Sequence, residues 1–196
     1  MNNPEEGFLW LLEALDRHEI AYMVGESAAS SAHGIYRATA DVDFVARLKK
    51  EDIEPLVAEL EAEFYIDGED MRSAIERGRS FNVIHTATGF KFDLFPLGDD
   101  EYQKTQFGRR RYEAAAVFGG EVVEFAMATA EDTILSKLRW YRMGGGSSER
   151  QWNDVLGVIT VKREELDYEY LREWAKYLGV SGELEKALEE RHQQGW

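Results

Sequence analysis

Apolar residues return every three or four positions in several stretches of the chain, which predicts amphipathic helices. The first stretch is 5–18, where Phe8, Leu11, Leu12 and Leu15 fall on one side. The same spacing predicts helices at 51–64, 149–160, 167–178 and 182–192.

Two further helices are indicated by the residues at their ends. Thr129, followed three residues later by Asp132, resembles a capping box, so we expect a helix from there to Met143. A run of small residues that ends at Gly34 predicts a short helix at 27–34.

Short apolar or alternating runs predict strands at 21–24, 41–48, 81–85, 90–97 and 121–127. The third and fourth are separated by a short turn sequence, which indicates a hairpin, whereas 67–80 is polar and reads as helix or loop. The expected fold is α+β: a small mixed sheet with flanking helices in residues 1–128, and a helical portion in 129–196.

The run Arg37-Ala38-Thr39-Ala40-Asp41-Val42-Asp43-Phe44-Val45 contains the strongest candidate for chemistry. On a strand, residues two apart project to the same face, so Asp41 and Asp43 point together, about 6–7 Å apart. Paired carboxylates on a rigid strand suit shared divalent ions. An Asp-x-Asp pattern alone is weak, because it recurs by chance in an acidic protein.

Gly25 and Ser27 follow the first strand and precede the small-residue helix. Gly25 would let the backbone approach a phosphate, which Ser27 and the first amides of the helix would bind. The alternative is an ordinary strand-to-helix turn capped by Ser27.

Asp93 interrupts the otherwise apolar run Phe92-Asp93-Leu94-Phe95. An unpaired buried carboxylate is costly, and a metal shared with Asp41 and Asp43 would explain its position. The alternative is a half-buried strand whose outer face carries Lys91 and Asp93.

Composition narrows the function. The 196 residues are 44% apolar with 5 Trp, 9 Tyr and 10 Phe, which indicates a folded core. The net charge of −15 disfavours extended nucleic-acid binding, which needs basic surface. There is no cysteine, and no apolar run is long enough to span a membrane. Because the N-terminus is acidic, unlike a signal peptide, we expect a cytoplasmic protein with no membrane partner.

Taken together, Gly25-x-Ser27, Asp41-x-Asp43 and Asp93 resemble the nucleotidyltransferase superfamily, and Arg37-x-Thr39-x-Asp41-x-Asp43 is similar to the AbiEii-type, toxin–antitoxin-associated members. The resemblance covers roughly residues 20–160. It also implies a lysine on a downstream helix and an aspartate on the next one, and Lys137 and Asp154 occupy the matching places.

The resemblance implies a reaction in which a nucleoside monophosphate passes from an NTP to an RNA, protein or small-molecule acceptor. Asp41, Asp43 and Asp93 would hold Mg²⁺ or Mn²⁺, with Asp93 as general base or metal ligand. Gly25, Ser27, Arg37, Thr39, Lys137 and Asp154 would bind the nucleotide. Without the resemblance, Lys137 reads equally well as an exposed helical residue.

Two features depart from the pattern. Glu26 places a carboxylate beside the expected phosphate site, and Asn153 stands where relatives have arginine. The alternative function is therefore a catalytically weak module that binds nucleotide or a toxin–antitoxin partner. Arg109-Arg110-Arg111 could steer RNA or a nucleotide, although a solvated charge run is the preferred interpretation. The sequence does not identify the acceptor, the base or the oligomeric state.

Overall fold

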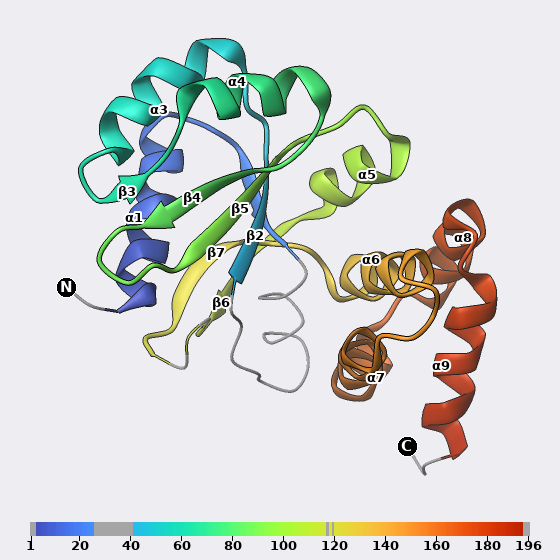
Figure 1. Cartoon of the computed structure of the whole chain (residues 1–196). Helices are drawn as coiled ribbons and strands as arrows, with labels where there is room; N and C mark the ends of the chain where they lie inside the picture. The colour runs from blue at the N-terminus through green and yellow to red at the C-terminus, as the bar shows by residue number, and fades with distance from the viewer. Residues whose placement is uncertain (1–2, 26–40, 117, 119, 194–196) are drawn as a thin grey trace.

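The computed structural model describes residues 3–25, 41–116, 118 and 120–193, and it has two parts that lie side by side (Figure 1). The first part is a mixed sheet with helices on it, and the second is a group of helices near the C-terminus. Within the described residues, no helix combines the length and the apolar character that crossing a membrane requires.

The first part contains α1 (Pro4–Arg17), β1 (Tyr22–Val24), β2 (Asp41–Ala46), the 3₁₀ turn η1 (Lys50–Asp52), α3 (Ile53–Leu60), β3 (Phe64–Tyr65), α4 (Gly68–Arg77), β4 (Phe81–His85), β5 (Lys91–Pro96), α5 (Glu101–Arg109), β6 (Arg111–Ala115) and β7 (Val123–Met127). The second part contains α6 (Ala130–Met143), α7 (Glu149–Lys162), the 3₁₀ turn η2 (Arg163–Glu165), α8 (Tyr168–Leu178) and α9 (Ser181–Gln193).

The described strands form one sheet in the order β3-β4-β5-β2-β1-β7-β6. The predicted hairpin is confirmed, because β4 and β5 pair antiparallel. The pairs β2–β5 and β1–β7 are parallel, so the sheet is mixed, as expected for the α+β fold.

One face of the sheet is covered by α1, α3 and α4; in Figure 1, α3 and α4 lie above the strands and α1 lies at the left. Alternation along β2 buries Val42, Phe44 and Ala46 in this layer. Phe44 contacts Phe8 of α1, with 5.9 Å between ring centroids. The strand is thereby anchored on one face, which leaves its other residues on the opposite face.

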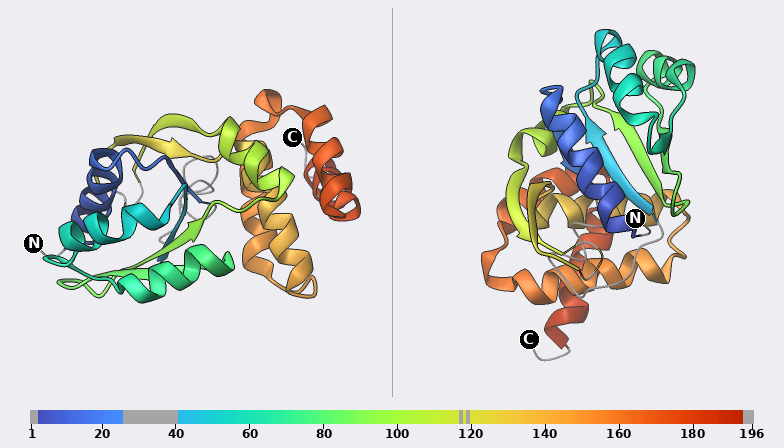
Figure 2. Two further views of the ribbon diagram at one scale, coloured as in Figure 1. Left: turned by 90° about the horizontal axis from the view of Figure 1, so that it is seen from above. Right: turned by 90° about the vertical axis from the view of Figure 1, so that its left-hand side faces the viewer.

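The C-terminal helices enclose a second apolar core, in which Ile134, Leu138, Val155 and Leu171 are fully buried. Thr129 caps α6 as predicted, since its hydroxyl accepts a hydrogen bond from the amide of Asp132. Helix α5 lies between the two parts in both Figure 1 and the left view of Figure 2.

Three elements differ from the sequence prediction. The short strand β3, helix α5 and strand β6 were not expected, and 67–80 contains a helix, α4. The expected helix at 27–34 lies outside the described residues.

Candidate active site

Three aspartates share one face of the sheet. β2 and β5 pair in parallel with Asp43 opposite Asp93 and Asp41 opposite Lys91. Because side chains alternate along a strand, all four point away from the face that α1, α3 and α4 cover. The strands therefore bring together the three carboxylates that the sequence analysis selected.

The charges on this face act on each other. Burial raises the pKa of Asp43 to about 6, and the neighbouring charges of Asp41 and Asp93 add to the effect. Lys137 and Lys91 act in the opposite direction. Lys137 comes from the second part of the molecule, so the face of the sheet and helix α6 form one electrostatic site.

Lys91 and Asp93 form an ion pair, with 2.7 Å between Nζ and Oδ2. In the alternative interpretation of this strand, Lys91 and Asp93 lie on its outer face, and the pair is found there. That face also carries Asp41 and Asp43, so the ion pair belongs to the carboxylate group rather than to an unrelated surface.

Within the ranges described, the structure holds no group of three or more histidine, aspartate or glutamate side chains already gathered for a metal ion. The three aspartates are a set of oxygen donors along two adjacent strands. Oxygen donors of this kind are those that Mg²⁺ and Mn²⁺ prefer.

Lys137 is only 1% exposed, so the interpretation of Lys137 as an exposed helical residue is wrong. Its Nζ lies 2.8 Å from Oδ2 of Asp154 and 3.3 Å from Oε1 of Gln151, both on α7. A buried ammonium needs such partners because desolvation of the charge is costly. The resemblance had matched Lys137 with Asp154, whereas Gln151 was not anticipated.

Gln151 lies three residues before Asp154 in α7, so both fall on one side of that helix. This spacing is the one sequence signal that could have identified Gln151. It is a weak signal, because a polar residue at this spacing also occurs on any solvated helix.

Gly25 lies directly beside Asp43. The amide of Gly25 donates a hydrogen bond of 2.7 Å to the carbonyl oxygen of Asp43. A Cβ atom at position 25 would lie 3.0 Å from the Cβ of Asp43 and 3.2 Å from its carbonyl oxygen. The absence of a side chain at Gly25 thus allows this close approach to Asp43, whether or not a phosphate binds. Three other residues expected to bind the nucleotide lie outside the described residues, namely Ser27, Arg37 and Thr39, as does Glu26.

The three consecutive arginines have different surroundings. Arg109 binds Glu131 and Asp132 of α6, and Arg110 lies over the Phe107 ring with its Cζ 4.2 Å from the centroid. Arg111 is exposed at the start of β6. The interpretation as a solvated charge run is therefore wrong for the first two.

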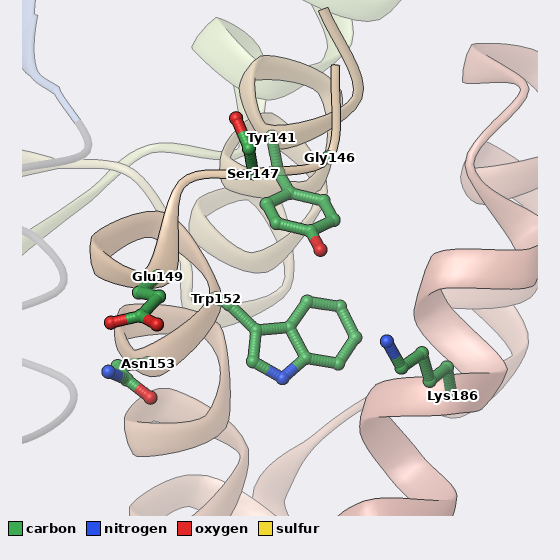
Figure 3. Close-up of a pocket in the computed structure, with 7 residues that line it drawn as sticks. All are labelled: Tyr141, Gly146, Ser147, Glu149, Trp152, Asn153 and Lys186. Atoms are coloured by element: carbon green, nitrogen blue, oxygen red, sulfur yellow. The ribbon is translucent and has the colours of Figure 1, made fainter. Parts of the chain in front are cut away.

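A separate pocket of about 580 Å³ lies in the helical part (Figure 3). It is lined by residues of α6, the following turn, α7 and α9: Tyr141, Gly146, Ser147, Glu149, Trp152, Asn153 and Lys186. The rings of Tyr141 and Trp152 lie 5.2 Å apart, and Nζ of Lys186 is 4.8 Å from the Trp152 centroid. Tyr141 is one helical turn beyond Lys137 on α6, whereas Lys137 and its partners Gln151 and Asp154 are not among the residues that line the pocket.

No protein-family model matches the sequence, and no curated protein matches it. Solved structures do match. The solution structure of the antibiotic-resistance factor ANT(2'')-Ia has a TM-score of 0.53 at 15% identity, covering 96% of both chains. The crystal structure of ANT(2'')-Ia in complex with adenylyl-2''-tobramycin has a TM-score of 0.53 at 14% identity, covering 87% of this chain and 94% of that one.

An antigenic nucleotidyltransferase-like protein from Paracoccidioides brasiliensis has a TM-score of 0.52 at 16% identity, covering 96% of this chain and 94% of that one. At such identities the likeness shows the fold alone. The chain has the nucleotidyltransferase fold, as the sequence predicted.

Proposed function

We propose that this nucleotidyltransferase fold is an active enzyme that transfers a nucleoside monophosphate from an NTP to a hydroxyl group. The observation that carries the proposal is the face formed by Asp41, Asp43 and Asp93, onto which the charge of buried Lys137 acts. Carboxylates on one face of a sheet, under the influence of a buried lysine, suit phosphoryl chemistry, which needs groups that bind divalent ions and a triphosphate.

The donor set fits Mg²⁺ or Mn²⁺. Mg²⁺ is held in proteins through one or two carboxylates together with water and substrate phosphates. The carboxylates on β2 and β5 are therefore sufficient to bind the ion once oxygens of the substrate complete its ligands. Burial, together with repulsion from Asp41 and Asp93, raises the pKa of Asp43, and a divalent cation would relieve the repulsion. When bound, the metal would neutralise the triphosphate and lower the pKa of the acceptor hydroxyl.

Each described residue of the site has a role in this proposal. Asp41 and Asp43 hold the metal, and Asp93 takes the proton of the acceptor hydroxyl or completes the ligand set. Lys137 neutralises charge on the triphosphate, while Asp154 and Gln151 hold its ammonium group. We assign nucleotide binding to Gly25. We assign the same role to three residues outside the described ranges: Ser27, Arg37 and Thr39.

Among acceptors we favour a small hydroxylated molecule. The structure of ANT(2'')-Ia with adenylyl-2''-tobramycin shows that this fold can hold an adenylylated small molecule. The net charge of −15 disfavours a long RNA, since phosphate contacts require basic surface. The pocket beside Tyr141 and Trp152 is our candidate place for part of the acceptor (Figure 3). Such an enzyme would work in the cytoplasm, where NTPs are available.

The second candidate is a binding module without turnover, related to AbiEii-type proteins and partnered by a toxin or antitoxin. Glu26 favours it, because a carboxylate next to Gly25 would repel a triphosphate. The two candidates differ in one observable, which is the release of pyrophosphate.

The purified protein is expected to be stabilised by an NTP with Mg²⁺, and to release pyrophosphate once an acceptor is present. Ligand at 100 times its Kd stabilises a protein by about 2.7 kcal/mol, which raises the melting temperature measurably. The melting temperature is measured with each NTP, with and without Mg²⁺, and pyrophosphate release is followed in a screen of hydroxylated small molecules, RNA and proteins. Stabilisation without pyrophosphate release would favour the binding module, and absence of both would contradict both candidates.

Asp93→Asn is expected to lower kcat about 10²–10⁴-fold, the usual contribution of a general base, while NTP affinity changes little. The same readouts apply to Asp99→Asn, a fully exposed carboxylate whose partner is Lys104. That control should keep parental turnover. An unchanged kcat in Asp93→Asn would remove Asp93 from the reaction.

A further inference from the structure

Helix α5 belongs to both cores. Tyr102 near its start is buried in the core of the helical part, with its ring 5.3 Å from that of Trp174. Phe107 near its end is buried in the core of the sheet part. The helix is therefore the place where any movement of one part against the other must be accommodated.

The end of α5 is bound to the start of α6 through charged groups. Nε of Arg109 lies 3.4 Å from Oδ2 of Asp132, and its Nη2 lies 3.4 Å from Oε2 of Glu131. Nearby, Gln106 donates a hydrogen bond of 3.1 Å to the hydroxyl of Ser136, the residue before Lys137. Helix α5 thus holds α6 at two places.

Helix α8 completes the arrangement. The hydroxyl of Tyr170 donates a hydrogen bond of 2.7 Å to Oδ1 of Asp132, and the guanidinium of Arg109 lies over the Tyr170 ring with Cζ 3.8 Å from its centroid. The other carboxylate, Glu131, accepts a hydrogen bond of 3.0 Å from the amide of Asp167, which caps α8. One arginine and two acids therefore join three helices.

The two acids of this group are buried, which makes its geometry demanding. Asp132 is 0% exposed and Glu131 is 8% exposed. A buried carboxylate is tolerated only when hydrogen bonds satisfy it, and Asp132 receives them from Tyr170 and from the hydroxyl of Thr129 at 2.9 Å. A displacement of α6 relative to α5 or α8 would leave a charge without its partners, so the network favours one arrangement of the helices.

We propose that Arg109, Asp132 and Tyr170 are positioning residues that set the place of Lys137 relative to the three aspartates of the sheet. Asp132 lies in the first turn of α6, and Lys137 follows in the same rigid helix. Fixing that turn against α5, which is rooted in the sheet core, fixes the lysine as well. The role rests on the proposed function, and none of the three residues touches substrate.

The mildest test is Tyr170→Phe, which removes one hydrogen bond to Asp132 and keeps the ring beneath Arg109. A misplacement of about 1 Å can lower a rate about 100-fold, so kcat is expected to fall about 10–100-fold with little change in the KM for NTP. The matched control is Tyr168→Phe in the same helix, whose hydroxyl donates to the backbone oxygen of Arg163. It should leave kcat unchanged.

Arg109 gives a second test with an internal rescue. Arg109→Met removes the charge between Glu131 and Asp132, whereas Arg109→Lys keeps it and loses the planar group. We expect kcat to be highest in the parent, lower in Arg109→Lys and lowest in Arg109→Met. Equal kcat in both variants, at the level of the parent, would overturn the positioning role.

A distance measurement tests positioning without activity. The chain has no cysteine, so Tyr65→Cys in β3 and Val161→Cys in α7 place two spin labels on exposed residues of the two parts. Tyr170→Phe is expected to broaden the distance distribution, whereas Tyr168→Phe is not. Identical distance distributions in the parent, Tyr170→Phe and Tyr168→Phe would overturn the positioning proposal. If the parent has no transferase activity but Tyr170→Phe still broadens the distribution, only the proposed function is overturned.

Discussion

Asp43→Asn is expected to abolish nucleotidyl transfer while making the protein without metal more stable. Loss of a metal-bound carboxylate at the centre of the site should lower kcat at least about 10³-fold, equivalent to about 4 kcal/mol of barrier. The gain in stability follows from burial and from the charges of Asp41 and Asp93, which raise the pKa of Asp43 to about 6. Ionised Asp43 is therefore held in the folded chain at a cost that asparagine does not have.

The pH dependence gives the sign of this effect. Because the pKa is higher in the folded state than the ordinary value of 3.8, the parent loses stability as the pH rises from that value through about 6. The variant should then be more stable by on the order of 1–3 kcal/mol at about pH 7.5, with no gain at about pH 3.5.

Urea unfolding without metal at the two pH values measures this gain, and NTP-dependent pyrophosphate release measures the loss of activity. Asp99→Asn, the exposed control, should show neither change. Full activity in Asp43→Asn would contradict the metal-site assignment, and a loss of stability at the higher pH would contradict the electrostatic argument.

Lys137→Met is expected to reduce turnover about 10²–10³-fold, as the loss of one charge-stabilising donor typically does. It should also destabilise the protein by about 3 kcal/mol, because Asp154 would keep its charge in a largely buried place without the ammonium group of Lys137. Triphosphate affinity should fall more than monophosphate affinity, since the missing ammonium acts on the additional phosphates.

A second substitution separates the two effects. In Lys137→Met/Asp154→Asn the carboxylate that faced the lysine is neutral as well, so we expect much of the stability to return while turnover stays low. Lys104→Met is the matched control, because Lys104 pairs with Asp99 at the same 2.8 Å but on the surface. It should change stability by less than about 1 kcal/mol. Stability and turnover that return together in the double variant would make Lys137 a structural residue only.

The parts of the fold that follow from local pattern were predictable. The helices with one apolar side and the β4–β5 hairpin lie where the sequence placed them, except that the helix predicted at 51–64 ends at Leu60. Helix α5 was missed because Tyr102 and Phe107 are buried in different cores, so no single apolar stripe marks it. Strand β6 was missed because neither of its faces is fully buried, which removes the alternation that identifies a strand.

The site was predictable to a similar degree. Asp41 and Asp43 share a face by strand geometry alone. Asp93 lies on the same face because β2 and β5 pair in parallel, which local pattern does not specify. The burial of Lys137 depends on Asp154 in another helix, so sequence spacing left it undecided. Arg109 was misread for the same reason, because its acidic partners are 22 and 23 residues away.

The close approach of Gly25 to Asp43 limits which substitutions position 25 can accept during evolution. A methyl group at position 25 would lie 3.0 Å from the Cβ and 3.2 Å from the carbonyl oxygen of Asp43, so even alanine would require Asp43 to move by a few tenths of an ångström. A lineage could replace Gly25 only together with a shift of Asp43, which couples the inheritance of two residues that are distant in sequence.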